Sequence, residues 1–352
     1  MSSDCDWNAL VSYLPADWEA LASRHGALRR LRGFDSAEAL LRTLLIHLGQ
    51  GCSLRETSVR AQRGGVAAVS DVAILKRLRR AEGWLHALCR RLCETTLAPS
   101  MPAQNRFRLV AVDATCISEP GSTGTDWKLH YALEMPSLTC VHFELTDSSG
   151  AEKFERFNLG QGDLVLADRA YCTLPGLRWA LGQKANVLVR MKLSQNNFYL
   201  PQAAQPLDFL DASGHLKVGE MIEWSGFLGK PGSSRVPGRL CLIRRPEEVA
   251  AMARHKTLRE ARKKGYQVRE RTLWAADYVG LFCSLQGEFS TAELFDLYRF
   301  RWQVELAFKR LKSITDFGHL PKRDPISCRA WIYGKLLVGL LVDKMAVSPF
   351  FP

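Results

Sequence analysis

Four side chains able to do chemistry share one face of a helix that the sequence predicts from residue 290 to 312. Ser290 and Glu293 match a capping box at its start, and no Gly or Pro interrupts the run before Gly318. With about 100° of rotation per residue, the four fall within an arc of about 60°. They are Tyr298, Arg301, Glu305 and Lys312. One carboxylate is therefore expected to stand among a phenol and two cations.

An apolar stripe runs beside this polar face and is expected to pack on a core. Its members are Leu297, Phe300, Val304, Ala307, Phe308 and Leu311. The plain alternative for the polar face is a solvated surface with ordinary charge pairs. The specific spacing Tyr-x2-Arg-x3-Glu-x6-Lys favours a functional site instead.

Two aspartates upstream follow short apolar runs that predict strands. Asp113 follows residues 109–112, and Asp168 follows residues 164–167, a continuous apolar run typical of a strand buried on both faces. Because the carboxyl ends of adjacent strands converge, both aspartates are expected near the helix that carries Glu305. Asp163 precedes its strand and is expected at the opposite end, and Asp147 lies in a predicted turn.

The four-residue helix resembles the signature of DDE transposases of bacterial insertion sequences, of the insertion-sequence-four type. The resemblance covers roughly residues 53 to 342, and Asp168-Arg169-x-Tyr171 matches the family's motif around its second aspartate. The resemblance implies an enzyme that cuts and rejoins DNA at the ends of an insertion sequence. Its catalytic and metal-binding residues would be Asp113, Asp168 and Glu305.

Transfer of a DNA phosphodiester needs an activated attacking oxygen and a stabilised leaving oxygen, and two Mg²⁺ ions about 3.5–4 Å apart provide both. Mg²⁺ prefers hard oxygen ligands, so three carboxylates suffice, and Mn²⁺ is expected to substitute. Asp168 is expected to bridge both ions. Within the resemblance, phosphates near the cleaved end are contacted by Tyr298, Arg301, Lys312, Arg169 and Tyr171. The resemblance also implies an aromatic side chain that stacks on a flipped base, which Trp274 or Tyr278 would supply; the alternative for either residue is a buried strand aromatic.

The N-terminal 100 residues predict a helical domain. Within residues 53–97, a short helix, a Gly64-Gly65 break and a basic helix from 72 to 97 follow the order of a helix-turn-helix DNA reader. The resemblance implies that this region recognises the terminal inverted repeats. A helical bundle with a solvated basic face is the alternative. The basic residues expected to bind DNA are Lys76, Arg77, Arg79 and Arg80.

The predicted fold class is α/β, with a helical DNA-binding domain before a ribonuclease-H-like catalytic core that carries a β-rich insertion. The core is expected over residues 105–191 and 274–347, and the insertion over 192–273. A proline-containing linker is expected at 98–105, a core strand at 274–285, and a second apolar helix at 326–347. The family resemblance, rather than periodicity, selects the ribonuclease-H-like fold.

The chain has 352 residues and a formal net charge of +12, which suits a polyanionic partner. Double-stranded DNA, as terminal repeats and target, is the expected partner, with a homodimer in the DNA complex and no membrane. The start lacks a signal peptide pattern, and scattered cysteines indicate reduced thiols, so a bacterial cytoplasmic, nucleoid-associated location is expected. The alternative function is a catalytically silent copy that acts only as a DNA-binding protein or repressor.

Overall fold

The computed structural model describes residues 2–29, 31, 33–94 and 107–347. Its N-terminal part is helical: α1 Ser2–Val11, α2 Trp18–Arg24, α3 Ala37–Gly49, α4 Leu54–Arg63, α5 Asp71–Arg80 and α6 Glu82–Glu94. The single helix expected from 72 to 97 is wrong, because the chain turns at Ala81 between α5 and α6. Residues 95–97 and the linker expected at 98–105 lie outside the described residues.

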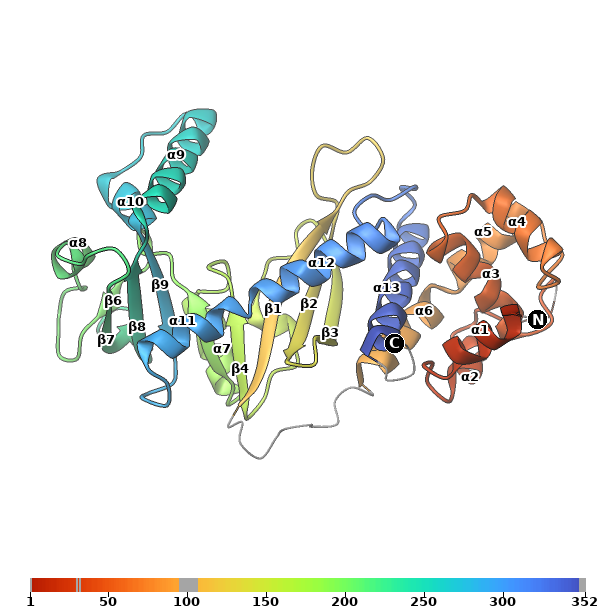
Figure 1. Cartoon of the computed structure of the whole chain (residues 1–352), viewed down its shortest axis with the longest axis horizontal. Coiled ribbons are helices and arrows are strands. Elements are labelled where there is room, and N and C mark those ends of the chain that lie inside the picture. The colour runs from red at the N-terminus through yellow and green to blue at the C-terminus, as the bar shows by residue number, and fades with distance from the viewer. Residues whose placement is uncertain (1, 30, 32, 95–106, 348–352) are drawn as a thin grey trace.

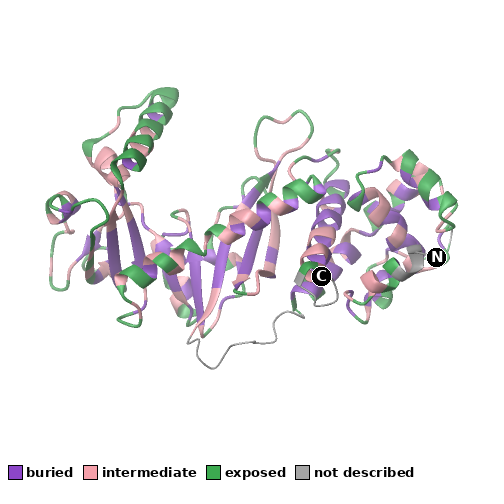
Figure 2. Cartoon of the chain, in the orientation of Figure 1, coloured by how far each residue is buried: buried purple, intermediate pink, exposed green. Residues whose placement is uncertain are grey.

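The central layer is a mixed sheet that positions both aspartates (Figure 1). Its first strands are β1 Arg108–Ile117, β2 Trp127–Met135, β3 Thr139–Asp147, β4 Asp163–Ala167 and β5 Asn186–Arg190, with η1 Phe154–Arg156 before β4 and α7 Leu174–Gly182 after it. Strands β1, β2 and β3 form an antiparallel meander, whereas β4 is parallel to β1 and to β5. Apolar side chains alternate between two cores, one on each face of the sheet, and Figure 2 shows the strands as largely buried.

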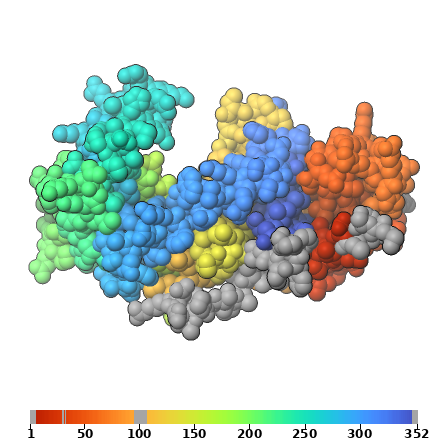
Figure 3. All heavy atoms as spheres, in the orientation of Figure 1, coloured from red at the N-terminus to blue at the C-terminus, as the bar shows by residue number. Residues whose placement is uncertain are grey.

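The insertion extends this sheet instead of forming a separate one. Its elements are β6 Phe198–Tyr199, α8 Phe209–Ser213, β7 Met221–Leu228, β8 Val236–Arg244, α9 Glu247–Lys264 and α10 Glu270–Trp274; η2 Ala275–Asp277 then leads back to the core strand β9 Tyr278–Cys283. Strand β9 pairs with both β5 and β8, which gives the order β3-β2-β1-β4-β5-β9-β8-β7-β6. Figure 3 shows the surface hollowed between the lobe formed by α9 and the loop that joins β1 to β2.

The strand expected from residue 274 begins four residues later, at Tyr278. Trp274 ends α10 and stacks on Phe209, with ring centroids 6.0 Å apart. The Tyr278 hydroxyl donates to the Ser213 carbonyl at 3.1 Å, and Tyr278 is buried. These contacts give both aromatic residues a packing role against α8 of the insertion.

The signature helix is two helices, α11 Thr291–Arg299 and α12 Trp302–Thr315. The expected capping box between Ser290 and Glu293 is present. The amides of Phe300 and Arg301 donate three residues back instead of four, so the turn tightens toward three residues per turn. The expected apolar stripe is therefore wrong at Phe300, which is 47% exposed, whereas Val304 beyond the break is buried.

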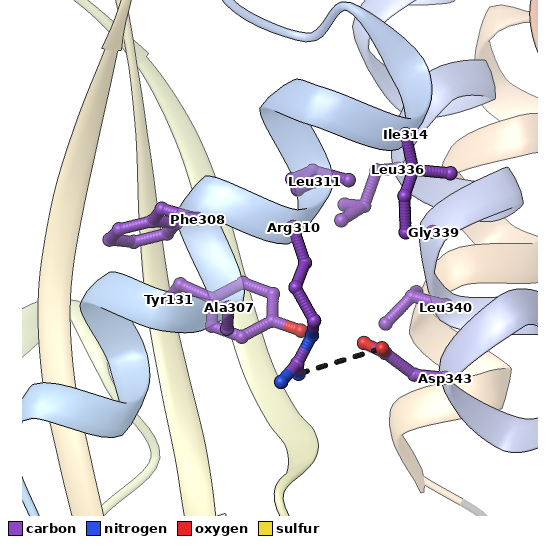
Figure 4. Close-up of a pocket in the computed structure, with 10 residues that line it drawn as sticks. All are labelled: Tyr131, Ala307, Phe308, Arg310, Leu311, Ile314, Leu336, Gly339, Leu340 and Asp343. Atoms are coloured by element: carbon purple, nitrogen blue, oxygen red, sulfur yellow. Dashed lines mark ion pairs between the residues drawn. The ribbon is translucent and has the colours of Figure 1, made fainter. Parts of the chain in front are cut away.

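The last helix, α13 Pro325–Val347, joins the sheet to the N-terminal helices. Gly339 lets it approach α12, because a Cβ there would lie 2.5 Å from Leu311 Cδ1. An Arg310–Asp343 ion pair at 3.6 Å crosses the same contact (Figure 4). Residues 325–346 are long and apolar enough to cross a membrane, but 72% of the apolar window is buried inside the protein. That burial is typical of a core helix.

Candidate active site

The register between β1 and β4 brings the two aspartates side by side. Val112 is opposite Ala167 in this parallel pair, so the next residues, Asp113 and Asp168, occupy neighbouring positions. Asp113 does not end its strand as expected, because β1 continues to Ile117 along β2. Its neighbour β4 does end there, at Ala167, so β1 has no strand beside it on that side from Asp168 onward.

Helix α12 brings Glu305 to the same place. The ring of Phe308 packs edge-on against Tyr131 of β2, with centroids 5.7 Å apart, and Tyr131 is paired with Asp113 across β1 and β2. Glu305 lies three residues before Phe308, almost one turn away on the same side of the helix. Packing of the apolar face on the sheet therefore sets the carboxylate of Glu305 above β1.

Arg301 bridges two of the three acidic residues. Its Nη1 lies 3.6 Å from Asp113 Oδ2, and its Nη2 lies 2.6 Å from Glu305 Oε1. The guanidinium carbon is 5.7 Å from the centre of the Tyr298 ring. Burial lowers the pKa of Arg301, but the surrounding Tyr298, Glu305 and Asp168 raise it by more. Tyr298, Arg301 and Glu305 thus meet despite the break between the two helices.

Burial raises the pKa of the Asp113 carboxyl to about 6. The Ala114 amide, which donates to Asp113 Oδ1 at 2.8 Å, and the Arg301 charge oppose that rise. Glu152 and Glu305 add to it by like-charge repulsion. Glu152, in the segment between β3 and β4, is a neighbour of the site that sequence reasoning missed. It lies in a loop without a motif, so no pattern in the sequence points to it.

The donor set suits a hard divalent cation in its chemistry, because all three side chains are carboxylates, and two of them, Asp113 and Glu305, meet at Arg301. Among the residues that the structure describes, no group of three or more His, Cys, Asp or Glu side chains is close enough to hold a metal ion. The expected set is therefore not assembled as a cage: Asp113 and Glu305 share the Arg301 guanidinium, and Asp168 stands beside Asp113 on the neighbouring strand.

Tyr171 and Arg169 follow Asp168 but differ in exposure. Tyr171 is 1% exposed and packs against Phe154, with ring centroids 5.3 Å apart. Its hydroxyl is buried without a hydrogen-bond partner in the described structure, and burial raises its pKa. In this conformation Tyr171 cannot reach a DNA phosphate as expected. Arg169 is exposed and can.

Two further arginines, Arg190 and Arg245, lie near Arg169 and were not singled out from the sequence. The pKa of Arg245 is lowered by burial and by the positive charges of Arg190 and Arg169, against the opposing charge of Asp277. We call Arg169, Arg190 and Arg245 the arginine patch. Arg190 ends β5, so the rule that strand ends converge would have found it, but Arg245 follows β8 and reaches the patch only because the insertion extends the sheet.

Of the remaining residues expected to contact DNA, four are exposed and one is buried. Lys312, Lys76, Arg79 and Arg80 are exposed, and Arg79 makes an ion pair with Asp324 at 3.4 Å. Arg77 is 8% exposed, donates to the Ala27 carbonyl at 3.2 Å and lies over the Phe34 ring. The expectation that Arg77 contacts DNA does not fit this position, because the side chain joins α5 to the N-terminal core.

Arg77→Ala is expected to lower the unfolding free energy by about 2 kcal/mol, since it removes buried packing and leaves the Ala27 carbonyl unpaired. Lys76→Ala with Arg80→Ala is expected to leave stability within about 0.5 kcal/mol. The double variant should instead flatten the salt dependence of DNA binding by about 2 in log–log slope, about 0.9 for each lost phosphate contact. Urea unfolding and salt titrations of a gel shift measure both. A stable Arg77→Ala protein with a flattened slope would place Arg77 at the DNA.

Comparison with known proteins identifies the family. Residues 105–341, which contain all three acidic residues, match the family described as "Transposase DDE domain". The chain belongs to the DDE transposases of insertion sequences. It is 34% identical over 349 residues to the transposase for insertion sequence element IS421 of Escherichia coli. The aligned region covers 97% of this chain and 94% of the relative.

A more distant relative is the transposase for insertion sequence element IS231B of Bacillus thuringiensis subsp. berliner, 23% identical over 92% of this chain and 75% of the relative. Among solved structures, a piggyBac transposase in a synaptic complex with hairpin DNA is 10% identical, with a TM-score of 0.49, over 95% of this chain and 71% of that chain. The family places this protein in DNA transposition, as an enzyme that cleaves DNA and transfers strands. Members of the family act with divalent metal ions.

Proposed function

We propose that this protein is a Mg²⁺-dependent transposase in which Asp113, Asp168 and Glu305 hold two metal ions, with Mn²⁺ able to substitute. The observation that carries the proposal is that Asp113 and Glu305 contact one guanidinium, while Asp168 stands beside Asp113 at the next position of the adjacent strand pair. When bound, the ions would activate the attacking oxygen and stabilise the leaving one. The catalytic core would be ribonuclease-H-like, with the strand order β3-β2-β1-β4-β5 as support.

The protein's own residues position the DNA in this proposal. The arginine patch and Lys312 bind phosphates near the cleaved strand, and Arg301 grips a phosphate when an end is present, because its planar fork suits two phosphate oxygens. The hollow between α9 and the β1–β2 loop lies beside this edge of the sheet and accommodates the duplex. Helix α9 ends in Arg262, Lys263 and Lys264, which adds positive charge to that lobe.

The N-terminal helices would read the terminal inverted repeats, with α5 presenting Lys76 and Arg80 to the phosphates. The partner is double-stranded DNA, as element ends and as target. We infer a homodimer in the DNA complex, because transposition must hold two ends together. Light scattering of the protein with and without end DNA measures that assembly, and one copy per pair of ends would refute it.

The decisive experiment incubates purified full-length protein with Mg²⁺ and DNA from the flanks of its own gene. Cleavage at the inverted repeats, lost on chelation and restored by Mg²⁺ or Mn²⁺, is the expected result. Binding to those ends without nicking in either metal would favour a silent DNA-binding copy instead. DNA of the same length and scrambled sequence is the control for nonspecific nuclease activity.

A further inference from the structure

Arg301 is the positively charged side chain between two carboxylates of the acidic site. Its side chain is 14% exposed, it contacts Asp113 and Glu305 at once, and the charge of Asp168 also acts on it. We propose that Arg301 is a displaceable internal cation that closes the metal site until a DNA end binds. In the DNA-free protein it pairs with Asp113 and Glu305 and offsets part of their negative charge, and in the DNA complex it moves to a phosphate and releases both carboxylates. This inference rests on the proposed metal site.

Competition for the same oxygen lone pairs is the physical basis. Arg301 holds Glu305 Oε1 at 2.6 Å, the length of a strong charge-assisted hydrogen bond. A hard divalent ion needs those lone pairs, and a fixed positive charge beside them repels it. Metal binding without DNA therefore requires removal of a half-buried guanidinium from its partners. A phosphate that accepts the guanidinium offsets that cost.

The surroundings of Arg301 indicate that its present contacts are incomplete. The Arg301 Nε and the neighbouring Tyr298 hydroxyl are both buried without a hydrogen-bond partner in the described structure. Arg301 also stands at the break between α11 and α12, where the tightened turn replaces regular helical hydrogen bonds. Both atoms are buried in this conformation, so a phosphate oxygen would reach them only once Arg301 moves outward. The arginine patch, whose Arg169 directly follows Asp168 in the chain, would draw a phosphate toward this site.

A consequence of this arrangement is reciprocal coupling. If DNA must remove Arg301 before metal binds, then DNA raises the affinity for metal, and metal raises the affinity for DNA by the same factor. Couplings between two sites of a protein commonly amount to about 5–150-fold. We expect about 10-fold here, and we expect the coupling to depend on the side chain at position 301.

The test measures Mn²⁺ affinity rather than activity. Free Mn²⁺ is followed by electron paramagnetic resonance during titration of the full-length protein, with and without saturating flank duplex. The duplex ends in a 3′-dideoxynucleotide so that strand transfer cannot occur, and Mn²⁺ bound by duplex alone is subtracted. In the wild type, DNA should tighten Mn²⁺ binding about 10-fold. Arg301→Ala should bind Mn²⁺ without DNA about as tightly as the wild type does with DNA, and DNA should then add less than about twofold.

Matched variants separate this inference from the metal site itself. Arg299→Ala removes an arginine from the same segment that is 83% exposed, and it should behave as wild type. Arg301→Gln keeps much of the side chain, so it should reproduce the alanine result if that variant folds poorly. If Asp113→Asn and Glu305→Gln weaken Mn²⁺ binding but both Arg301 variants match the wild type, the internal cation is refuted and the metal site stands. If the two acidic variants bind Mn²⁺ as the wild type does, both proposals fail.

Discussion

Glu305→Gln is expected to reduce Mg²⁺-dependent nicking at least about 1000-fold, equivalent to about 4 kcal/mol of barrier, while end binding in a gel shift changes less than about twofold. The amide keeps the shape of the side chain but loses the charge that a metal ion requires. DNA affinity is supplied by cations elsewhere, so it should persist. Nicking of flank duplex in Mg²⁺ and in Mn²⁺, with a gel shift on the same preparations, measures both effects.

Asp296→Asn is the matched control for this prediction. Asp296 lies on α11, is 69% exposed and pairs only with the exposed Arg299 among the contacts described, so its loss should change neither assay. Arg301→Ala should give a third pattern, with slower but still detectable nicking and weaker binding to cleaved ends, because it removes a phosphate contact but no metal ligand. Wild-type nicking by Glu305→Gln would show that Glu305 is not a metal ligand, and α12 would then be an ordinary packed helix.

Asp113→Asn is expected to abolish nicking and, at pH 7.5, to raise the unfolding free energy by about 1–3 kcal/mol. The pKa of Asp113 in the folded protein is about 6, above its ordinary 3.8, chiefly because of burial. The unfolded chain loses this proton at lower pH than the folded protein does. The ionised carboxylate therefore destabilises the fold increasingly as pH rises from about 4 to about 6, and fully above that. Asparagine carries no such cost.

The pH dependence is the signature of this effect. The gain in stability of Asp113→Asn, from urea unfolding, should be large at pH 7.5 and small at pH 4.5, where the wild-type carboxyl is largely protonated in the folded state. Asp147→Asn should gain nothing at either pH, because hydrogen bonds from Ser149 lower the pKa of Asp147 and stabilise its charged form. An equal gain for Asp113→Asn at both pH values would mean that packing, rather than ionisation, sets its stability.

Several parts of the site were predictable because they depend on local patterns. The capping box at Ser290 and the buried run before Asp168 follow from neighbouring residue types, and both are present. The placement of Tyr298, Arg301 and Glu305 on one helix face, at about 100° of rotation per residue, assumed one regular helix. These three residues do lie together in the structure. The same assumption placed Phe300 in the core, where it is not, because no residue type in the sequence marks the tightened turn at Arg301.

The sequence by itself determined the chemistry: which carboxylates, cations and apolar faces the chain offers, at spacings that point to phosphoryl transfer on DNA. Only the tertiary structure decided how they combine. The register of β1 with β4 sets Asp113 beside Asp168, and the extended sheet brings Arg245 to the arginine patch. Arg77 and Tyr171 are buried, whereas the basic residues close to each of them in the chain are exposed. These outcomes depend on contacts between residues far apart in the chain, whose free energies no local pattern encodes.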